Sequence, residues 1–284
     1  MGATIVDADF KVAMDALCSQ YKSDEALTAD PISITGGYKS SVDKELASWV
    51  AAHLAYGRVG PMLRAIRRLL EPLGHEPALW LRERPEQRVR AELSSSLRGW
   101  VWRFHVIEDM ANWILAWKQM DSSTGYSGIE PLLLPGSSQT ADQRISSLIH
   151  SLRNSLPKTQ GIRFNLPDPL KGAAAKRWRM FLRWMVRKGW PDFGIWRKYP
   201  ASELIIPLDT HVHRISRQIG LCARRSQDGK AAHEITNALK KLDQKDPLKY
   251  DFALAHLGIL GDCNGKRREA CKACPLDRLC MVRH

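Results

Sequence analysis

The sequence predicts an all-α fold in two lobes. Apolar residues recur at helical spacing through most of the 284 residues, and we find no β-hairpin signal, internal repeat or low-complexity tract. Two irregular stretches, residues 125–139 and 156–171, interrupt this helical pattern. A chain of this length buries a sizeable core and commonly divides into two. We therefore expect one helical lobe over residues 40–155 and a second that combines 1–39 with 156–284.

The helices are expected in the following order. Residues 9–29 have amphipathic spacing, and Asp30-Pro31 ends that helix. Residues 41–73 predict two helices with a break at Gly57 to Pro61, and Ser41 is the expected cap of the first. Further helices are expected over residues 76–98, 99–120, 140–155 and about 172–188.

The charge of the chain is unevenly distributed. Lys and Arg outnumber Asp and Glu by 43 to 30, and the isoelectric point is about 9.6. Sixteen Lys and Arg against five Asp and Glu lie between Lys158 and Lys230, which is +11 of the +13 total. Concentrated positive charge is what a polyanion-binding surface requires, although a generally basic soluble protein is the simpler alternative. We find no signal peptide and no apolar run long enough for a bilayer, so we expect no membrane partner.

Four cysteines lie close together near the C-terminus, in the pattern C-x7-C-x2-C-x5-C: Cys263, Cys271, Cys274 and Cys280. A disulfide framework needs an oxidising compartment, which nothing upstream indicates, so a metal centre is favoured. Structural zinc usually takes two closely spaced pairs, whereas only Cys271 and Cys274 form one here. The uneven spacing favours a [4Fe–4S] cluster, with a zinc knuckle as the alternative. Four cysteine ligands leave no open position, so we expect a structural role.

A second informative stretch is Ile205 to Leu221, IIPLDTHVHRISRQIGL. Asp209 and Thr210 stand where a helix begins, because Val212, Ile215 and Ile219 follow at helical spacing. Taken alone, Asp209 is best explained as a helix N-cap. His211 would be partly buried or at the surface.

The order of these features resembles the helix-hairpin-helix DNA glycosylases related to endonuclease III. A basic helix, then LDTHVHRI, then the cysteine pattern follow one another as in that superfamily. FLRWMVRK, DFGIW and KYDFAL within residues 172–284 look like a little-characterised bacterial family of it. The resemblance implies a two-lobed helix-hairpin-helix fold, a C-terminal [4Fe–4S] cluster loop, and lesion-containing double-stranded DNA as the partner. It also implies a monomeric, cytoplasmic, nucleoid-associated protein.

The same resemblance implies two catalytic residues. Asp209 stands at the position of the catalytic carboxylate, and Lys176 is the counterpart of the Schiff-base lysine, with Lys171 in reserve. A carboxylate stabilises the positive sugar formed during N-glycosidic cleavage, and it can accept the proton of an attacking amine. The start of a helix and the neighbouring Arg177 disfavour the ammonium form of Lys176. A phosphate contact or a solvated surface position is the alternative for Lys176.

The hairpin departs from the superfamily pattern, because Leu166 to Gly172 offers a single glycine. Lys176 and Asp209 are also far apart along the sequence, because residues 189–203 are inserted between them. In the stretch VAAHLAYGRVG, either Tyr56 or Arg58 could fill the gap that a flipped base leaves in the stack. The alternative is that Tyr56 packs inside the protein and Arg58 contacts a phosphate. DNA contacts are expected from Arg58, Lys171, Gly172, Arg177, His211 and Arg214.

These features together predict a base-excision repair glycosylase with AP lyase activity that acts through Asp209 and Lys176. An oxidised purine such as 8-oxoguanine is the favoured lesion. Ten Trp are available to line a base pocket, although most of them are expected in the core. Two alternatives stay open: a non-catalytic iron–sulfur protein that recognises bent or branched DNA, and an RNA-directed protein.

Overall fold

A computed structural model describes residues 7–134 and 139–282, and it confirms that the chain is mostly helical. Fourteen α-helices and one two-stranded β-ribbon form the described part, with short 3-10 turns between them. The N-terminal helices are α1 (Ala8–Gln20), α2 (Asp24–Thr28), α3 (Ile32–Thr35), α4 (Ser41–Leu54), α5 (Val59–Leu70), α6 (Pro77–Arg82) and α7 (Glu86–Ser96). The others are α8 (Ile107–Ser123), α9 (Ala141–Ser155), α10 (Gln160–Asn165), α11 (Lys176–Val186), α12 (Thr210–Gln218), α13 (Gly229–Leu242) and α14 (Asp251–Ile259).

Helices α4 and α5 arise as the sequence predicts, with a shift of one residue at the cap. Ser40, rather than Ser41, caps α4, because its Oγ accepts a hydrogen bond of 3.0 Å from the Asp43 N–H. Gly57, at φ +89°, makes the break before α5. Five apolar side chains of α5 are buried and its arginines are exposed: Met62, Leu63, Ile66, Leu69 and Leu70 against Arg64, Arg67 and Arg68.

The prediction of helix over residues 99–120 is wrong at its start. A β-ribbon of β1 (Val101–Trp102) and β2 (His105–Val106) precedes α8, with Val101 opposite Val106. Gly99 and Arg103 both have positive φ, which turns the chain back on itself and excludes a helix there. The ribbon is two residues per strand, too short for a period-2 pattern to appear in the sequence.

The stretch 156–171, expected to be irregular, contains a short helix. Thr159 caps α10 by accepting a hydrogen bond of 3.2 Å from the Ile162 N–H. Helix α11 begins at Lys176, four residues later than expected, because the Ala173–Ala175 segment stays outside it. Ala175 is in the left-handed region, at φ +46°. Lys176 is therefore the first residue of its helix.

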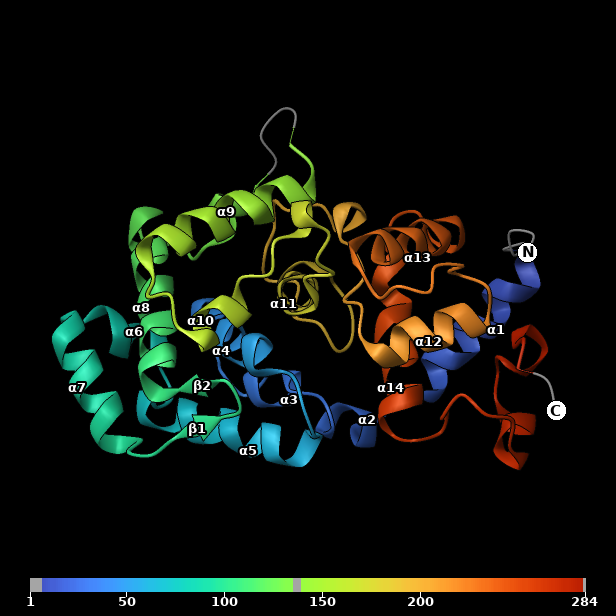
Figure 1. The fold of residues 1–284 in the computed structure, drawn as a ribbon, viewed down its shortest axis with the longest axis horizontal. Helices are drawn as coiled ribbons and strands as arrows, with labels where there is room; N and C mark the ends of the chain where they lie inside the picture. The colour runs from blue at the N-terminus through green and yellow to red at the C-terminus, as the bar shows by residue number, and fades with distance from the viewer. Residues whose placement is uncertain (1–6, 135–138, 283–284) are drawn as a thin grey trace.

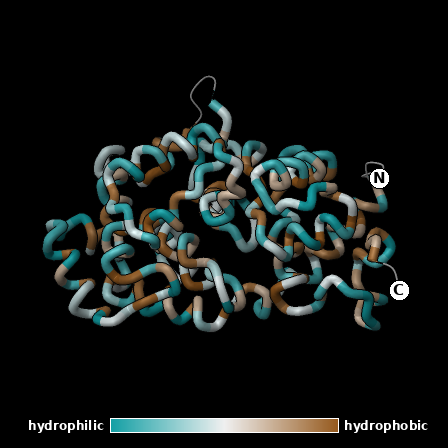
Figure 2. The backbone as a smooth tube through the Cα atoms, in the orientation of Figure 1, coloured by the Kyte–Doolittle hydropathy of each residue, from teal (hydrophilic) through white to brown (hydrophobic). Residues whose placement is uncertain are grey.

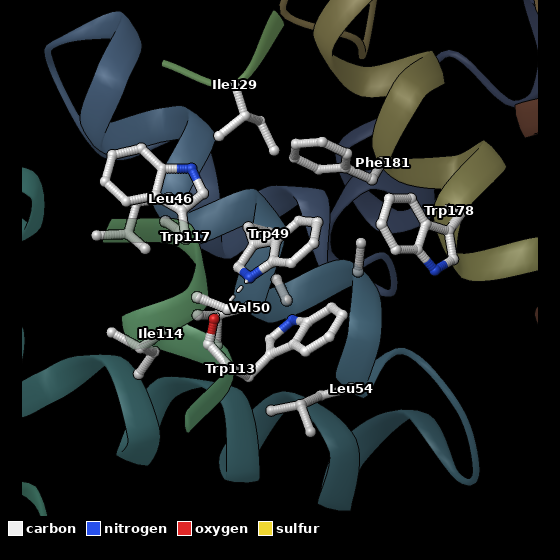
Figure 3. Packing of buried hydrophobic residues seen from close by; sticks show 14 of the residues in the cluster. Leu46, Trp49, Val50, Leu54, Trp113, Ile114, Trp117, Ile129, Trp178 and Phe181 are labelled. Carbon is white, nitrogen blue, oxygen red and sulfur yellow. Dashed lines mark hydrogen bonds between the residues drawn. The ribbon is translucent and has the colours of Figure 1, made fainter. Parts of the chain in front are cut away.

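The buried apolar side chains form two separate cores. In the first core, Trp49 of α4 stacks on Trp113 of α8 at 4.3 Å between ring centroids, and Trp178 and Phe181 of α11 meet Trp49 edge-on (Figure 3). The second core gathers side chains of α1, α12, α13 and α14, which lie together beside both termini in Figure 1. Helix α11, expected in the second lobe, thus packs its buried side chains into the first core.

The helices that form these two cores are amphipathic rather than uniformly apolar. Figure 2 shows hydrophobic and hydrophilic residues alternating along the tube in both halves of the protein. Over residues 7–134 and 139–282, none of the helices has the length and the apolar character that crossing a membrane would need.

Candidate active site

A cleft of about 500 Å³ lies where the two cores meet. Its walls come from the starts of α11 and α12, from the face of α14 that carries Asp251, Ala255 and Ile259, and from the turn before α5. Both residues expected to be catalytic line this cleft. A larger surface depression of about 960 Å³, next to the start of α4, includes neither of them.

Asp209 caps α12 and also faces the cleft. Its Oδ1 accepts a hydrogen bond of 2.8 Å from the Val212 N–H, which makes it the N-cap that the sequence predicts. Its Oδ2 lies 3.4 Å from the Nζ of Lys176. The two functions weighed for Asp209 are therefore compatible, because each uses a different carboxylate oxygen. The cap also fixes the orientation of the second oxygen.

Lys176 reaches Asp209 from the first turn of α11. Its side chain is 32 % exposed and that of Asp209 is 15 % exposed, so the amine is accessible from the cleft while the carboxylate is more enclosed. The N–H groups of a first helical turn point toward the same end and favour negative charge there.

Arg177 lies inside the protein rather than on the surface where we expected a DNA contact. The residue is 7 % exposed, and its guanidinium covers the ring of Phe164 at 3.9 Å. It donates hydrogen bonds to the His53 carbonyl, the Asn165 side chain and the Phe164 carbonyl. No carboxylate within the described ranges pairs with it. Burial lowers the pKa of this guanidinium to about 10.

The other residues expected to contact DNA occupy different positions. Lys171 and Gly172 are exposed on the turn before α11, and Arg58 is exposed at the edge of the cleft. Tyr56 instead packs: its Oη donates to the Trp102 carbonyl at 3.1 Å, and burial raises its pKa to about 12. Both residues weighed for filling a gap in the base stack line the cleft, and Arg58 is the more exposed of the two.

Asp168 organises the turn between α10 and α11 that lacks the expected glycines. The residue is 3 % exposed, and its carboxylate accepts from the Ser146 hydroxyl at 2.8 Å and the Leu170 N–H at 3.0 Å. Its backbone carbonyl accepts from the N–H groups of Lys171 and Ala173. A buried carboxylate thus stabilises this turn. Only Gly172, at φ +88°, needs to be glycine.

Part of the positive charge of residues 158–230 is internal, which the sequence could not reveal. Arg177, Arg179, Arg183 and Arg187 are at most 8 % exposed, and the last three pair with carboxylates. The cations that remain exposed in this segment are Lys158, Arg163, Lys171, Lys188, Arg197, Lys198, Arg217, Arg225 and Lys230.

The cysteine loop packs against α12, the helix that Asp209 caps. Arg214 Nη2 donates to the Cys263 carbonyl at 2.9 Å and lies 3.4 Å from the Nδ1 of His211, which lines the cleft. Gln218 Nε2 donates to the Gly265 carbonyl at 3.2 Å. Arg214, expected to contact DNA, therefore joins the helix of the cleft to the cysteine loop.

The four thiols do not form a closed coordination site in the described part of the chain. Within residues 7–134 and 139–282, no three Cys, His, Asp or Glu side chains are arranged to hold a metal ion. Burial raises the pKa of the Cys274 thiol, and the nearby Cys263, Cys271 and Cys280 raise it further. The Arg268 N–H also points at Cys271 Sγ, 3.4 Å away. Cysteine thiolates are the ligands that iron–sulfur clusters take, but the described residues do not bring these four thiols together as a metal site.

Sequence reasoning missed a group of buried polar residues below the cleft. Asp251, at the start of α14, pairs with Arg183 of α11, and Arg183 also donates to Asp192 at 3.1 Å. Burial raises the pKa of Asp251 to about 6, against the opposing effect of Arg183. The motif KYDFAL contains Asp251. Nothing in its spacing identified Arg183 as the partner.

Comparison with known proteins gives a family and no function. A sequence model described as "Protein of unknown function (DUF2400)" matches residues 30–260, most of the chain. No curated protein and no solved structure matches it.

Proposed function

The chain belongs to the DUF2400 family, and we propose that it is a DNA base-excision glycosylase with AP lyase activity. The observation that carries the proposal is the 3.4 Å separation between Lys176 Nζ and Asp209 Oδ2 within one cleft. Amine and carboxylate come from different helices and different cores, yet they meet where a sugar carbon can reach both. The proposed fold is the two-lobed helix-hairpin-helix arrangement of these enzymes.

The proposed reaction uses both side chains on one nucleotide. The nitrogen of Lys176 forms a bond to C1′ of the sugar while the N-glycosidic bond breaks, and the base leaves with the bonding electron pair. Asp209 stabilises the positive charge that develops on the sugar and takes up the proton that Lys176 loses. The sugar ring of this adduct then opens: the C1′–O4′ bond breaks, O4′ takes the proton held by Asp209, and the nitrogen lone pair forms the C=N bond of a Schiff base. The lyase step cleaves the strand from this intermediate.

The cleft suits a base that has left the stack. Its volume, about 500 Å³, lies within the usual range of small-molecule sites. Arg58 at its edge and the exposed Lys171 and Gly172 beside α11 are the nearest candidates for contacts to phosphates. An exposed Phe104 on the β1–β2 turn lies 6.2 Å from Tyr56 between ring centroids and adds an apolar surface there.

The proposed cofactor is a [4Fe–4S] cluster held by Cys263, Cys271, Cys274 and Cys280, one thiolate to each iron. It would hold the C-terminal loop against α12 through Arg214 and Gln218, and no step of the reaction passes through it. The charge of Lys266, Arg267 and Lys272 would then be presented from a rigid loop.

Borohydride trapping tests this function. Purified protein is incubated with duplexes that carry 8-oxoguanine, uracil, thymine glycol or an abasic site, and the Schiff base is reduced to a stable adduct. We expect an adduct with at least one duplex, loss of that adduct in Lys176→Ala, and its retention in Lys171→Ala. Tight binding without adduct or base release from any duplex would instead establish a non-catalytic DNA-binding protein.

A further inference from the structure

The closed side of the cleft carries polar atoms that no protein group satisfies. Asp251 and Arg183 line the cleft and are 2 % and 3 % exposed, yet Asp251 Oδ1 and Arg183 Nη2 have no hydrogen-bond partner within the described residues. Buried polar atoms are nearly always paired, so an unpaired acceptor and an unpaired donor on one wall require an explanation. The ion pair between these residues uses only Asp251 Oδ2 and Arg183 Nη1.

Asp30 adds a third group to this wall. It lines the cleft and is 8 % exposed, and its Oδ1 accepts from the Ile32 N–H at 2.9 Å. Its Oδ2 lies 3.8 Å from His256 Nε2. The Nδ1 of His256 is 2.8 Å from the Phe252 carbonyl, which can only accept, so the ring carries its proton on Nδ1. Asp30 Oδ2 and His256 Nε2 are then two acceptors that face each other, and none of the residues that the structure describes donates to either.

We propose that Asp30, Arg183 and Asp251 form a base-reading wall for the inner edge of a guanine-type base. This inference rests on the proposed function. The inner edge of guanine, like that of 8-oxoguanine, carries a carbonyl oxygen, a ring N–H and an amino group in a row. The guanidinium of Arg183 supplies a donor for the carbonyl, and the two carboxylates supply acceptors for the ring N–H and the amino group.

The same wall disfavours pyrimidines that have two carbonyl groups. Uracil and thymine derivatives place a ring N–H between two carbonyl oxygens. One of these oxygens would face a carboxylate, which has no proton to donate to a hydrogen bond and would repel the oxygen. A site built around hydrogen bonds to a base strongly rejects an analogue that leaves its buried groups unpaired. Hypoxanthine is the sharper probe, because it differs from guanine only in lacking the amino group.

Binding by a catalytically silent protein tests this wall separately from the chemistry. In the Lys176→Ala background, affinity is measured for duplexes that carry 8-oxoguanine, 8-oxohypoxanthine or thymine glycol. We expect 8-oxoguanine to bind at least about tenfold more tightly than either of the others. Asp251→Asn should bring the ratio to 8-oxohypoxanthine close to one. Asp30→Asn is the second variant, in case the first does not fold.

Asp192→Asn is the matched control, because Asp192 also pairs with Arg183 but does not line the cleft. It should lower stability and leave the preference intact. The inference is overturned if both Asp251→Asn and Asp30→Asn retain the preference, or if thymine glycol binds as tightly as 8-oxoguanine. Enclosed water molecules would then satisfy these atoms. If the preference holds but the wild-type protein releases no base, the recognition stands and the proposed catalysis fails.

Discussion

Lys176 Nζ and Asp209 Oδ2 lie 3.4 Å apart, although one side chain belongs to a helix of the first core and the other caps a helix of the second. The capping bond to Val212 holds the Asp209 carboxylate in place before any substrate arrives. In the proposed reaction this preorganisation helps, because the carboxylate need not reorient as the sugar becomes positive.

Asp209→Asn should strongly slow base release while leaving the fold intact. Asparagine caps a helix about as well as aspartate, so α12 should keep its start, but the charge opposite the sugar is lost. We expect the single-turnover rate of base release to fall by a factor of about 10² to 10³, with unchanged affinity for the duplex.

Asp228→Asn provides the control for that substitution. Asp228 caps α13 in the same way, with Oδ1 accepting a hydrogen bond of 2.9 Å from the Ala231 N–H. It should leave base release unchanged. Equal rates for Asp209→Asn and the control would remove Asp209 from the chemistry.

Gly258→Ala should disturb the cleft through the contact between α14 and α12. A Cβ on Gly258 would stand 2.4 Å from His211 Nδ1 and 2.6 Å from His211 Cβ, so one helix must move. We expect a loss of roughly 1–3 kcal/mol in unfolding free energy, measured by urea titration, together with slower base release.

The matched substitution is Gly60→Ala, in the first turn of α5. Its nearest neighbour would be the flexible end of Arg64 at 3.5 Å. Alanine favours a helix over glycine by up to about 1 kcal/mol, so stability should be unchanged or slightly higher. A comparable loss in both variants would show that close packing against His211 is not the cause.

Cys274→Ser should remove the brown colour expected of an iron–sulfur cluster and weaken DNA binding. Without the fourth thiolate, the C-terminal loop would lose the centre that orders it. Visible absorbance and iron content of the purified protein are the measurements. Cys18→Ser, outside the loop, should retain both, and a Cys274→Ser protein with full iron content would contradict the assignment.

The ionisation of Glu45 should make the free energy of unfolding decrease as pH rises. It is 3 % exposed and accepts from the indole N–H groups of Trp117 and Trp196, and burial raises its pKa to about 7. The folded-state pKa is above the 4.5 of an exposed glutamate, so the neutral form stabilises the fold. The contribution of neutral Glu45 to the free energy of unfolding is complete below about pH 4.5 and is lost as pH rises to about 7. The total loss is on the order of 3 kcal/mol.

Glu45→Gln should flatten that part of the profile of unfolding free energy against pH, measured in urea. Glu130→Gln is the control, because Glu130 also accepts backbone N–H groups, at Lys198 and Tyr199. It should follow the wild-type profile. If Glu45→Gln retained the full wild-type decrease, another group would be responsible.

The features that the sequence predicts well depend on neighbouring residues. The start of α12 at Asp209-Thr210 follows from a capping side chain three residues before the amide it binds, so it is visible in a short window. The β-ribbon before α8 was missed because two residues per strand give no periodicity. The pairing of Arg183 with Asp251, 68 residues apart, depends on how α11 and α14 cross, which no local pattern encodes.

Since α11 is anchored in one core and α12 in the other, the attacking amine and its carboxylate partner are aligned only while the two halves stay docked. In the proposed reaction, a bound duplex that resists bending would separate the two halves and so stop catalysis. Flexibility of the DNA at a damaged site would then be a second requirement for cleavage, independent of the identity of the base.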